Sequence, residues 1–394
     1  MKVGIITPWF PTPETPYGGV FVAQQASALR QAGHEVTVVH LDAVASPPMA
    51  DQQADTIARA FAAADAVAYP VPGLDDGVRV VRVPFMSASG AGFHARALAA
   101  REQLDRCWRR LHDDAGGFEI LHAHVTMPAG YAAIGRGVPV VTTEHFTGVD
   151  RVLAQAAARQ AFVDVVDSSR MLCVSSFLRR AITRAIGGER VEVEVVPNMV
   201  DFTDLDYEPR HTLGQRWVYV GSLNARKNVD LLICSFAHFR ATNPEATLTV
   251  VGGGELQDHL VATADRLEVA RDVTFLGSQP RDRAAAEIRR ADLLCHLSSL
   301  ETFGLTCVEA IASGAPVISL ANGGAESAWG AIEHSCGRIL SPHLDEVTIA
   351  AEVERLADRR HELDLEAASQ WVRERYAPSV ISARLTGIYQ ELSP

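Results

Sequence analysis

The sequence predicts an α/β protein made of two doubly wound, Rossmann-like domains. Its 394 residues are more than a single ordinary hydrophobic core accommodates. In both halves short β-branched runs alternate with amphipathic stretches, which is the pattern of parallel sheets covered by helices on both faces. Between residues 199 and 212 no helical period continues, and Pro197, Asn198 and Pro209 interrupt the chain. We therefore expect one domain on each side of this hinge, with a ligand cleft between them.

The predicted strands form two series. In the first half they are KVGIIT, EVTVVH, VRVVRV, EILHAH, PVVTT, MLCVS and VEVEVV, and in the second half RWVYVG, TLTVVG, VTFLG, LLCHLS and PVISL. Helical periods occupy residues 19–32, 175–187 and 229–241. VEVEVV alternates instead of staying apolar, which is typical of an edge strand. The last pattern, PSVISARLTGIYQELSP, predicts a terminal helix that packs back across the domains.

The composition argues against several classes of partner. A formal net charge of −12 disfavours nucleic acid and an anionic membrane as partners of the whole chain. Residues 94–112 predict a basic amphipathic helix that would suit anionic lipid, but at this net charge we favour a solvated face. No apolar run approaches the ~20 residues of a membrane-spanning helix.

The start of the chain and its cysteines favour a cytoplasmic protein. MKVGIITPWFPTP is interpreted as a buried strand and a turn instead of a signal peptide. The six cysteines are scattered without a CxxC pair, which suits a reducing compartment and argues against a disulfide framework or a zinc site.

Two cations stand between a predicted strand and a predicted helix in YVGSLNARKNVDLLICSF. Arg226 and Lys227, together with the free N–H groups of a helix start, would form an anion site suited to a diphosphate. The alternative is a solvated surface pair, the usual fate of charged residues. Among 36 basic residues lysine occurs elsewhere only at Lys2, and this rarity favours a function for Lys227.

The segment SSLETFGLTCVEAIASGAPVI predicts a turn and then a helix from Gly304 to Ser313. Backbone amides at its start would hold sugar hydroxyls or phosphate, and they belong to Phe303, Gly304, Leu305 and Thr306. Glu301 is expected to accept hydrogen bonds from sugar hydroxyls, and Glu309, one turn into the helix, to bind two ribose hydroxyls. A capping box from Thr306 to Glu309 is the alternative, and it explains Glu309 but not Glu301.

Loops in the first half add further candidates. In TPWFPTPETPYGGVFVAQQASAL, Gly18 and Gly19 precede a helix and let N–H groups approach an anion, the alternative being a flexible turn. The pattern is not GxGxxG, so a nicotinamide cofactor is not indicated. HAHVTMPAG and TTEHFTG each end a strand, and we interpret His122 and His124 as structural and His145 as a ligand of a sugar hydroxyl or leaving group. No ligand spacing indicates a metal.

Taken together, these segments resemble a family-four glycosyltransferase, a retaining enzyme with the GT-B fold. The motif of two glutamates separated by seven residues is Glu301 to Glu309. VGSLNARKN resembles the diphosphate loop, VPNMVD the interdomain signature, VTFLG the strand near the nucleotide base, PYGGVF the Gly-Gly loop and TEHF the histidine loop. There are two departures. Ser222 stands where the family often has arginine, a charge that we expect Arg226 to supply, and NGGAE stands where the family has GGxPE.

The resemblance implies transfer of a sugar, a hexose or N-acetylhexosamine, from a nucleotide diphosphate, with UDP as the default nucleotide, retention of configuration and no metal. Residues 1–200 would bind the acceptor, residues 201–378 the donor, and residues 379–394 would form a crossover helix. The catalytic residues would be His145, Glu301, Arg226 and Lys227. The donor would be bound by Gly18, Gly19, Phe303, Gly304, Leu305, Thr306 and Glu309.

The acidic balance suits a small soluble acceptor, such as a natural-product or cell-envelope precursor, and the arginine bias suggests a GC-rich bacterial source. Loops near residues 8–20 and 70–95 would shape the acceptor site. Two alternatives remain open: a sugar-nucleotide 2-epimerase on the same fold, and a non-catalytic sugar-nucleotide-binding protein. An inverting enzyme would need a base in the first loop, which offers only Glu14, and a phosphorylase would need a lysine after Lys227.

Overall fold

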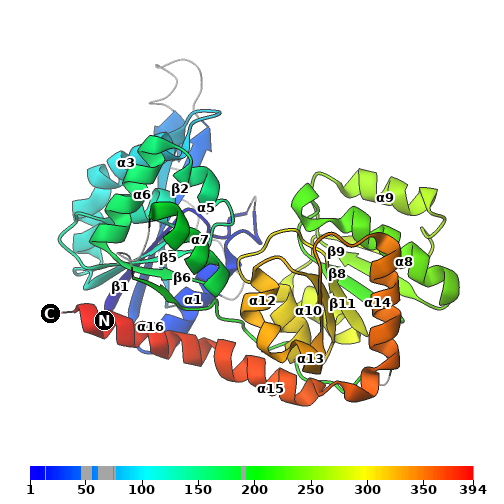
Figure 1. Cartoon of the computed structure of the whole chain (residues 1–394). Helices are drawn as coiled ribbons and strands as arrows, with labels where there is room; N and C mark the ends of the chain where they lie inside the picture. The colour runs from blue at the N-terminus through cyan, green and yellow to red at the C-terminus, as the bar shows by residue number, and fades with distance from the viewer. Residues whose placement is uncertain are drawn as a thin grey trace. The chain divides into compact units, whose positions relative to one another are not determined.

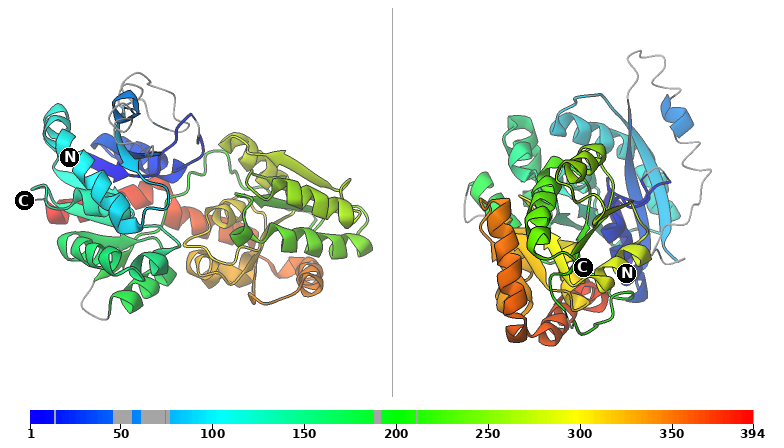
Figure 2. Two further views of the ribbon diagram at one scale, coloured as in Figure 1. Left: turned by 90° about the horizontal axis from the view of Figure 1, so that it is seen from above. Right: turned by 90° about the vertical axis from the view of Figure 1, so that its right-hand side faces the viewer.

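The computed structural model describes residues 1–13, 15–45, 56–60, 74, 77–187, 192–210 and 212–393. They form two compact units, and Figure 1 labels the elements of each. The first unit comprises Met1–Met199 together with Pro378–Pro394, and the second comprises Val200–Ala377. Each unit contains a parallel sheet with helices on both faces, seen from two further directions in Figure 2, so the predicted fold class is confirmed. Glu14 and most of residues 70–76 lie outside the described residues.

The sheet of the first unit has the strand order β3-β2-β1-β4-β5-β6-β7 among the described residues, and its pairings are parallel. VEVEVV supplies the last strand, at the edge, as predicted. The strands are β1 (Lys2–Thr7), β2 (Glu35–Ala45), β3 (Arg79–Ser87), β4 (Ile120–His124), β5 (Val140–Glu144), β6 (Arg170–Cys173) and β7 (Val193–Val195). The helices are α1 (Val20–Gln31), α3 (Phe93–Asp114), η1 (Thr126–Gly130), α4 (Tyr131–Ala133), α5 (Val149–Leu153), α6 (Ala156–Ser168), α7 (Ser176–Ile186) and α16 (Pro378–Leu392).

Alternate residues of the first sheet enter two different cores, because successive side chains of a strand point to opposite faces. Val3 and Ile5 of β1 belong to the core that α1 and α16 cover. Ile6 belongs to the core on the other face, which α3, α4 and α6 cover. The C-terminal helix is therefore an integral layer of the first unit, where Ile381 and Leu385 are buried.

The sheet of the second unit has the order β10-β9-β8-β11-β12-β13 among the described residues. The strands are β8 (Arg216–Val220), β9 (Thr247–Val251), β10 (Val273–Gly277), β11 (Leu293–His296), β12 (Val317–Leu320) and β13 (Gly337–Leu340). The helices are η2 (Ala225–Lys227), α8 (Val229–Thr242), α9 (Gln257–Arg266), α10 (Arg281–Arg290), α11 (Leu305–Ala312), α12 (Gly324–Ala328), η3 (Gly330–Ile332), α13 (Glu333–Cys336), α14 (Glu346–Asp358), η4 (Arg360–Glu362) and α15 (Leu365–Tyr376). No helix in the described part of the chain is long and apolar enough to cross a membrane.

The strand order places a topological switch point in each sheet. In the second unit the chain runs from β8 outward to β10 and then returns to place β11 on the other side of β8. The loops that follow β8 and β11 therefore lie next to each other at the carboxyl edge of the sheet, and open α/β sheets bind ligands at such a switch point. The same reversal separates β1 from β4 in the first unit.

Gly252, directly after β9, brings two loops of the second unit into contact. Its φ is +138°, and a Cβ there would lie 1.8 Å from the carbonyl oxygen of Gly221. A side chain at this position would push away the loop that follows β8.

We expect Gly252→Ala to lower the free energy of unfolding by about 3 kcal/mol, the sum of an unfavourable backbone conformation and a forced backbone shift. Gly277→Ala is the matched control, because Gly277 also has positive φ (+69°) but no atom within 4 Å of its Cβ position, and should cost only about 1–2 kcal/mol. Denaturant titration measures both, and equal losses would contradict the steric argument.

Candidate active site

Two loops meet at the switch point of the second sheet. The loop after β8 contains η2, and its Arg226 carbonyl oxygen accepts a hydrogen bond of 2.9 Å from the backbone N–H of Ser299 in the loop after β11. The Asn228 side-chain amide donates to the carbonyl oxygen of Leu297 at 3.0 Å. These bonds hold the ARK and SSLET segments together, so residues more than 70 positions apart share one site.

Glu301 is the centre of this site. Its Oε1 accepts from the Lys227 ammonium at 2.5 Å, from the Arg226 guanidinium at 3.2 Å and from His296 Nε2 at 3.3 Å. Arg226 also donates to the carbonyl oxygen of Leu300 at 2.5 Å. The second carboxylate oxygen, Oε2, has no hydrogen-bond partner within the described ranges. The structure thus brings together three of the four residues predicted to be catalytic and leaves one acceptor oxygen free.

Electrostatics keep Glu301 ionised. Burial opposes its charge, but the hydrogen bond from His296 and the charge of Lys227 outweigh burial and hold the pKa of the carboxyl far below its ordinary value. Burial lowers the pKa of His296, so that ring is neutral and donates through Nε2–H. Two cations facing one carboxylate leave a net positive charge at the switch point, which suits an anionic ligand.

Helix α11 starts next to this cluster, and its first residue is Leu305. Its N-cap is Gly304 in the left-handed conformation, with φ +84°, and no side chain caps the helix. The capping box from Thr306 to Glu309 is therefore not formed. Among the described residues the amides of Phe303, Gly304, Leu305 and Thr306 find no backbone acceptor, so this helix start offers unpaired donors.

Glu309 lies one turn into α11 and is partly buried. Burial raises the pKa of its carboxyl, and the positive charge of Arg281 opposes that shift. In the described part of the chain the carboxyl group forms no hydrogen bond or ion pair. A carboxylate left without a partner in this way is available to a ligand with paired hydroxyl groups.

The NGGAE segment, residues 322–326, holds the loop that carries Glu301 in place. The Asn322 carbonyl oxygen accepts from the Glu301 backbone N–H at 2.9 Å, while its side-chain oxygen accepts from the first amides of α12. Gly324 is required because a Cβ would lie 2.7 Å from Cβ of Glu301. The Glu326 carboxylate accepts from the backbone N–H groups of Asn322 and Gly323. The segment that departs from GGxPE therefore positions Glu301.

The first unit contains the fourth predicted catalytic residue. His145 follows β5, its Nε2 lies 3.0 Å from Nδ1 of His124, and its ring packs 4.8 Å from that of Phe21. Burial lowers the pKa of His145 to about 3, so the imidazole is neutral. Glu144 beside it is buried and accepts from three backbone N–H groups, two of them in its own turn, which fixes the direction in which the chain leaves β5.

Gly18 and Gly19 precede α1 at the carboxyl edge of the same sheet. Gly19 is the N-cap with φ +68°, and a Cβ there would lie 2.3 Å from the carbonyl group of Trp9. Only glycine fits this close approach. As at α11, no acceptor within the described ranges faces the amides of Gly19, Val20 and Phe21.

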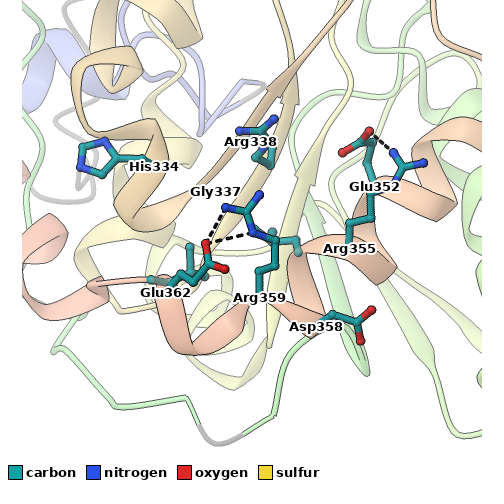
Figure 3. Close-up of a pocket in the computed structure, with 10 residues that line it drawn as sticks. His334, Gly337, Arg338, Glu352, Arg355, Asp358, Arg359 and Glu362 are labelled. Carbon is teal, nitrogen blue, oxygen red and sulfur yellow. Dashed lines mark hydrogen bonds and ion pairs between the residues drawn. The ribbon is translucent and has the colours of Figure 1, made fainter.

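A separate hollow of about 480 Å³ lies in the second unit, away from these loops (Figure 3). Two ion pairs line it, Arg359 with Glu362 and Arg355 with Glu352. Within the described residues, no group of three His, Cys, Asp or Glu side chains is placed to hold a metal ion.

Comparison with known proteins gives the family. A model described as "Glycosyltransferase Family 4" matches residues 18–204, and one described as "Glycosyl transferases group 1" matches residues 214–374. The chain belongs to this family of glycosyltransferases, which take a sugar from a nucleotide-sugar donor, and its fold is GT-B.

Individual relatives agree with this assignment. The chain is 28% identical over 325 residues to a glycogen synthase of Mycobacterium tuberculosis, covering 78% of this chain and 74% of the relative. It is 28% identical over 421 residues to a phosphatidyl-myo-inositol mannosyltransferase of Mycolicibacterium smegmatis, covering 100% and 94%. In fold it is similar to sucrose-phosphate synthase of Thermosynechococcus elongatus (TM-score 0.73, 18% identity, 99% and 98% covered) and to Anabaena HepE in complex with UDP and glucose (0.69, 18%, 99% and 100%).

The ionised state of Glu301 predicts a pH dependence. Because its folded pKa is depressed, its stabilisation is complete above its unfolded pKa of about 4.5 and is lost as pH falls from there toward the folded pKa. We expect Glu301→Gln to lower the free energy of unfolding at pH 7 by on the order of 1–3 kcal/mol, and the difference to shrink below about pH 4. Glu287→Gln, which removes an ion pair with the exposed Arg290, is the control at about 0.5 kcal/mol or less. Denaturant titration at several pH values measures both, and a difference for Glu301→Gln that does not change with pH would contradict the assignment.

Proposed function

We propose that the protein transfers a hexose or N-acetylhexosamine from UDP to a hydroxyl group of a small soluble acceptor, with retention of anomeric configuration and without a metal ion. The observation that carries this proposal is the cluster in which Lys227 and Arg226 share the Glu301 carboxylate beside the open start of α11. The structures of Anabaena HepE in complex with UDP and glucose and with UDP-glucose support the choice of nucleotide.

In the proposed reaction the donor diphosphate lies between the two cations and the amides at residues 303–306. As the bond between the anomeric carbon and the diphosphate oxygen breaks, negative charge develops on the leaving group. Fixed positive charges and N–H groups aimed at that position stabilise the transition state, which is usually the largest electrostatic contribution to catalysis. These donors supply what a metal ion would otherwise provide.

In this proposal, two carboxylates accept hydrogen bonds from the nucleotide sugar, and one imidazole donates a hydrogen bond to it. Oε2 of Glu301 accepts from sugar hydroxyls, Glu309 accepts from the two ribose hydroxyls, and His145 donates to a hydroxyl of the transferred sugar. The acceptor hydroxyl attacks the anomeric carbon on the face that the diphosphate leaves, and a diphosphate oxygen takes its proton. One C–O bond forms as another breaks, and configuration is retained.

A calorimetric screen of UDP-, GDP- and ADP-sugars tests the donor assignment, and UDP-sugars should bind with the highest affinity. NMR of the sugar released during slow donor hydrolysis should show the donor's own anomeric configuration first. Isomerisation of the donor when it is incubated alone would instead support a 2-epimerase, and tight binding without any turnover would support a non-catalytic binding protein.

Lys227→Ala should reduce kcat/KM by about 10²–10³, the range for loss of one donor that stabilises developing negative charge. Arg290→Ala is the matched control, since it removes an exposed cation of the same unit that forms an ion pair with Glu287, and should leave kcat/KM unchanged. Steady-state kinetics measure both variants. Retention of full activity in Lys227→Ala would remove the electrostatic basis of the proposal.

The role of Glu309 is tested with a modified nucleotide. Wild-type protein should bind UDP about tenfold or more tightly than 2′-deoxy-UDP, because a hydrogen bond to a charged group contributes about 1.5–3 kcal/mol. In Glu309→Gln this ratio should fall toward one while affinity for inorganic pyrophosphate stays the same. Calorimetry gives the three affinities, and an unchanged ratio would assign the ribose to other residues.

A further inference from the structure

A chain of hydrogen bonds crosses the interior of the first unit from the C-terminal helix to His145. The Tyr389 hydroxyl of α16 lies 2.5 Å from Nδ1 of His122, and Gln25 Nε2 lies 3.2 Å from the same nitrogen and 3.1 Å from Nε2 of His124. His124 Nδ1 then meets Nε2 of His145 at 3.0 Å. All five side chains are buried.

We infer that all the hydrogen bonds in this series are donated in one direction, which Tyr389 sets. The series thereby fixes His145 as the Nδ1–H tautomer, which can donate a hydrogen bond to its ligand. The inference rests on the proposed function for the role of that donor, but the tautomer itself does not depend on turnover. His124, Gln25 and Tyr389 are thereby positioning residues that act through His145.

The direction begins at the tyrosine hydroxyl. Tyr389 is fully buried, and in the described part of the chain His122 is its one hydrogen-bond partner. A buried O–H that fails to donate costs free energy, so Tyr389 donates and Nδ1 of His122 accepts. Nε2 of His122 then carries the proton and donates to the Thr143 hydroxyl at 2.7 Å.

The same logic continues through Gln25. Nδ1 of His122 has a single lone pair, which accepts from Tyr389, and an amide oxygen 3.2 Å away would be repelled by it. The side-chain atom of Gln25 at this position is therefore the amide nitrogen, and that NH₂ group donates to Nε2 of His124. A neutral imidazole that accepts at one nitrogen carries its proton on the other, so His124 donates from Nδ1 to Nε2 of His145.

The final proton is on Nδ1 of His145, which is buried and has no hydrogen-bond partner among the described residues. The nearby side chain of Asn198 opposes the lowering of the pKa of His145, but it is not placed to form a hydrogen bond with Nδ1. An unpaired buried N–H is unfavourable until an acceptor oxygen arrives. Burial lowers the pKa of each of the three histidines, so all are neutral and each has a defined tautomer.

The direct test is NMR of the full-length protein labelled with ¹⁵N-histidine, in which long-range ¹H–¹⁵N correlations identify the protonated ring nitrogen. The 14 histidines make assignment necessary, and the signals lost in His145→Asn identify that ring. Wild-type protein should show His145 protonated at Nδ1. Protonation at Nε2, or a mixture of tautomers, would overturn the inference even if sugar transfer is observed.

Gln25→Glu should reverse the direction in which His124 and His145 donate their hydrogen bonds, because a carboxylate only accepts hydrogen bonds. His124 would then donate to it from Nε2, and His145 would donate to His124 from Nε2, so its Nδ1 would lose the proton. Tyr389→Phe removes the group that sets the direction and should give a mixture of tautomers at His145. Leu392→Ala is the control, because Leu392 also lies on α16 but takes no part in these hydrogen bonds, and it should leave the tautomer unchanged.

Comparing kcat of two His145 variants distinguishes a ring that donates a hydrogen bond from Nδ1 from a ring with only a structural role. An Asn side chain can place its N–H where Nδ1–H lies, whereas a Gln side chain places its amide near Nε2. His145→Gln should therefore lose about tenfold in kcat relative to His145→Asn, the range for one hydrogen bond. Equal losses in the two variants would contradict a donor at Nδ1. If no substrate is turned over at all, the proposed function fails, and the NMR result still decides the tautomer.

Discussion

The organisation of the second unit depends on one buried carboxylate. Glu301 takes its place because its backbone N–H is bonded to Asn322 and its side chain to Lys227 and Arg226. Removing the carboxylate would leave two partly buried cations facing each other, and like charges repel strongly where water is partly excluded. The interaction that joins the two loops at the switch point thus also holds the two cations of the proposed anion site together.

This arrangement explains why so many small residues surround the site. Gly252 touches the carbonyl of Gly221, Gly324 touches Glu301, and Gly304 starts α11 in a conformation that suits glycine. Gly252 and Gly324 allow a closer approach than a side chain would permit, whereas Gly304 is needed for its positive φ. The unpaired N–H groups at the start of α11 are fixed by the fold, and preorganised donors of this kind are usually the ones that contribute most to catalysis.

The sequence contained enough to predict the architecture and the main charged residues of the site. Alternating strand and helix patterns specified both sheets, because the central strands bury both faces and the helices bury one. GRIL, the strand β13, was not predicted because only two of its four residues are apolar. Glu301, Arg226 and Lys227 were found from their positions after strands. His296 and Asn322 were not, since their importance comes from contacts with Glu301 that spacing does not reveal. His122 and His124 were interpreted as structural, and only the hydrogen-bond geometry shows that they connect Tyr389 to His145.

The two units stabilise their buried polar side chains in different ways. Burying polar side chains is costly unless each finds a partner. At the switch point of the second unit Glu301 stays ionised despite burial, because His296 donates a hydrogen bond to it and Lys227 places a positive charge beside it. In the first unit burial keeps His122, His124 and His145 neutral, and hydrogen bonds determine where their protons lie. A charged cluster attracts an anion strongly but does little to orient it. A series of neutral hydrogen-bonded side chains orients a ligand but adds little net charge. The proposed transfer of a sugar from a nucleotide diphosphate would use the charged cluster where negative charge develops and the neutral histidines where a hydroxyl group is oriented.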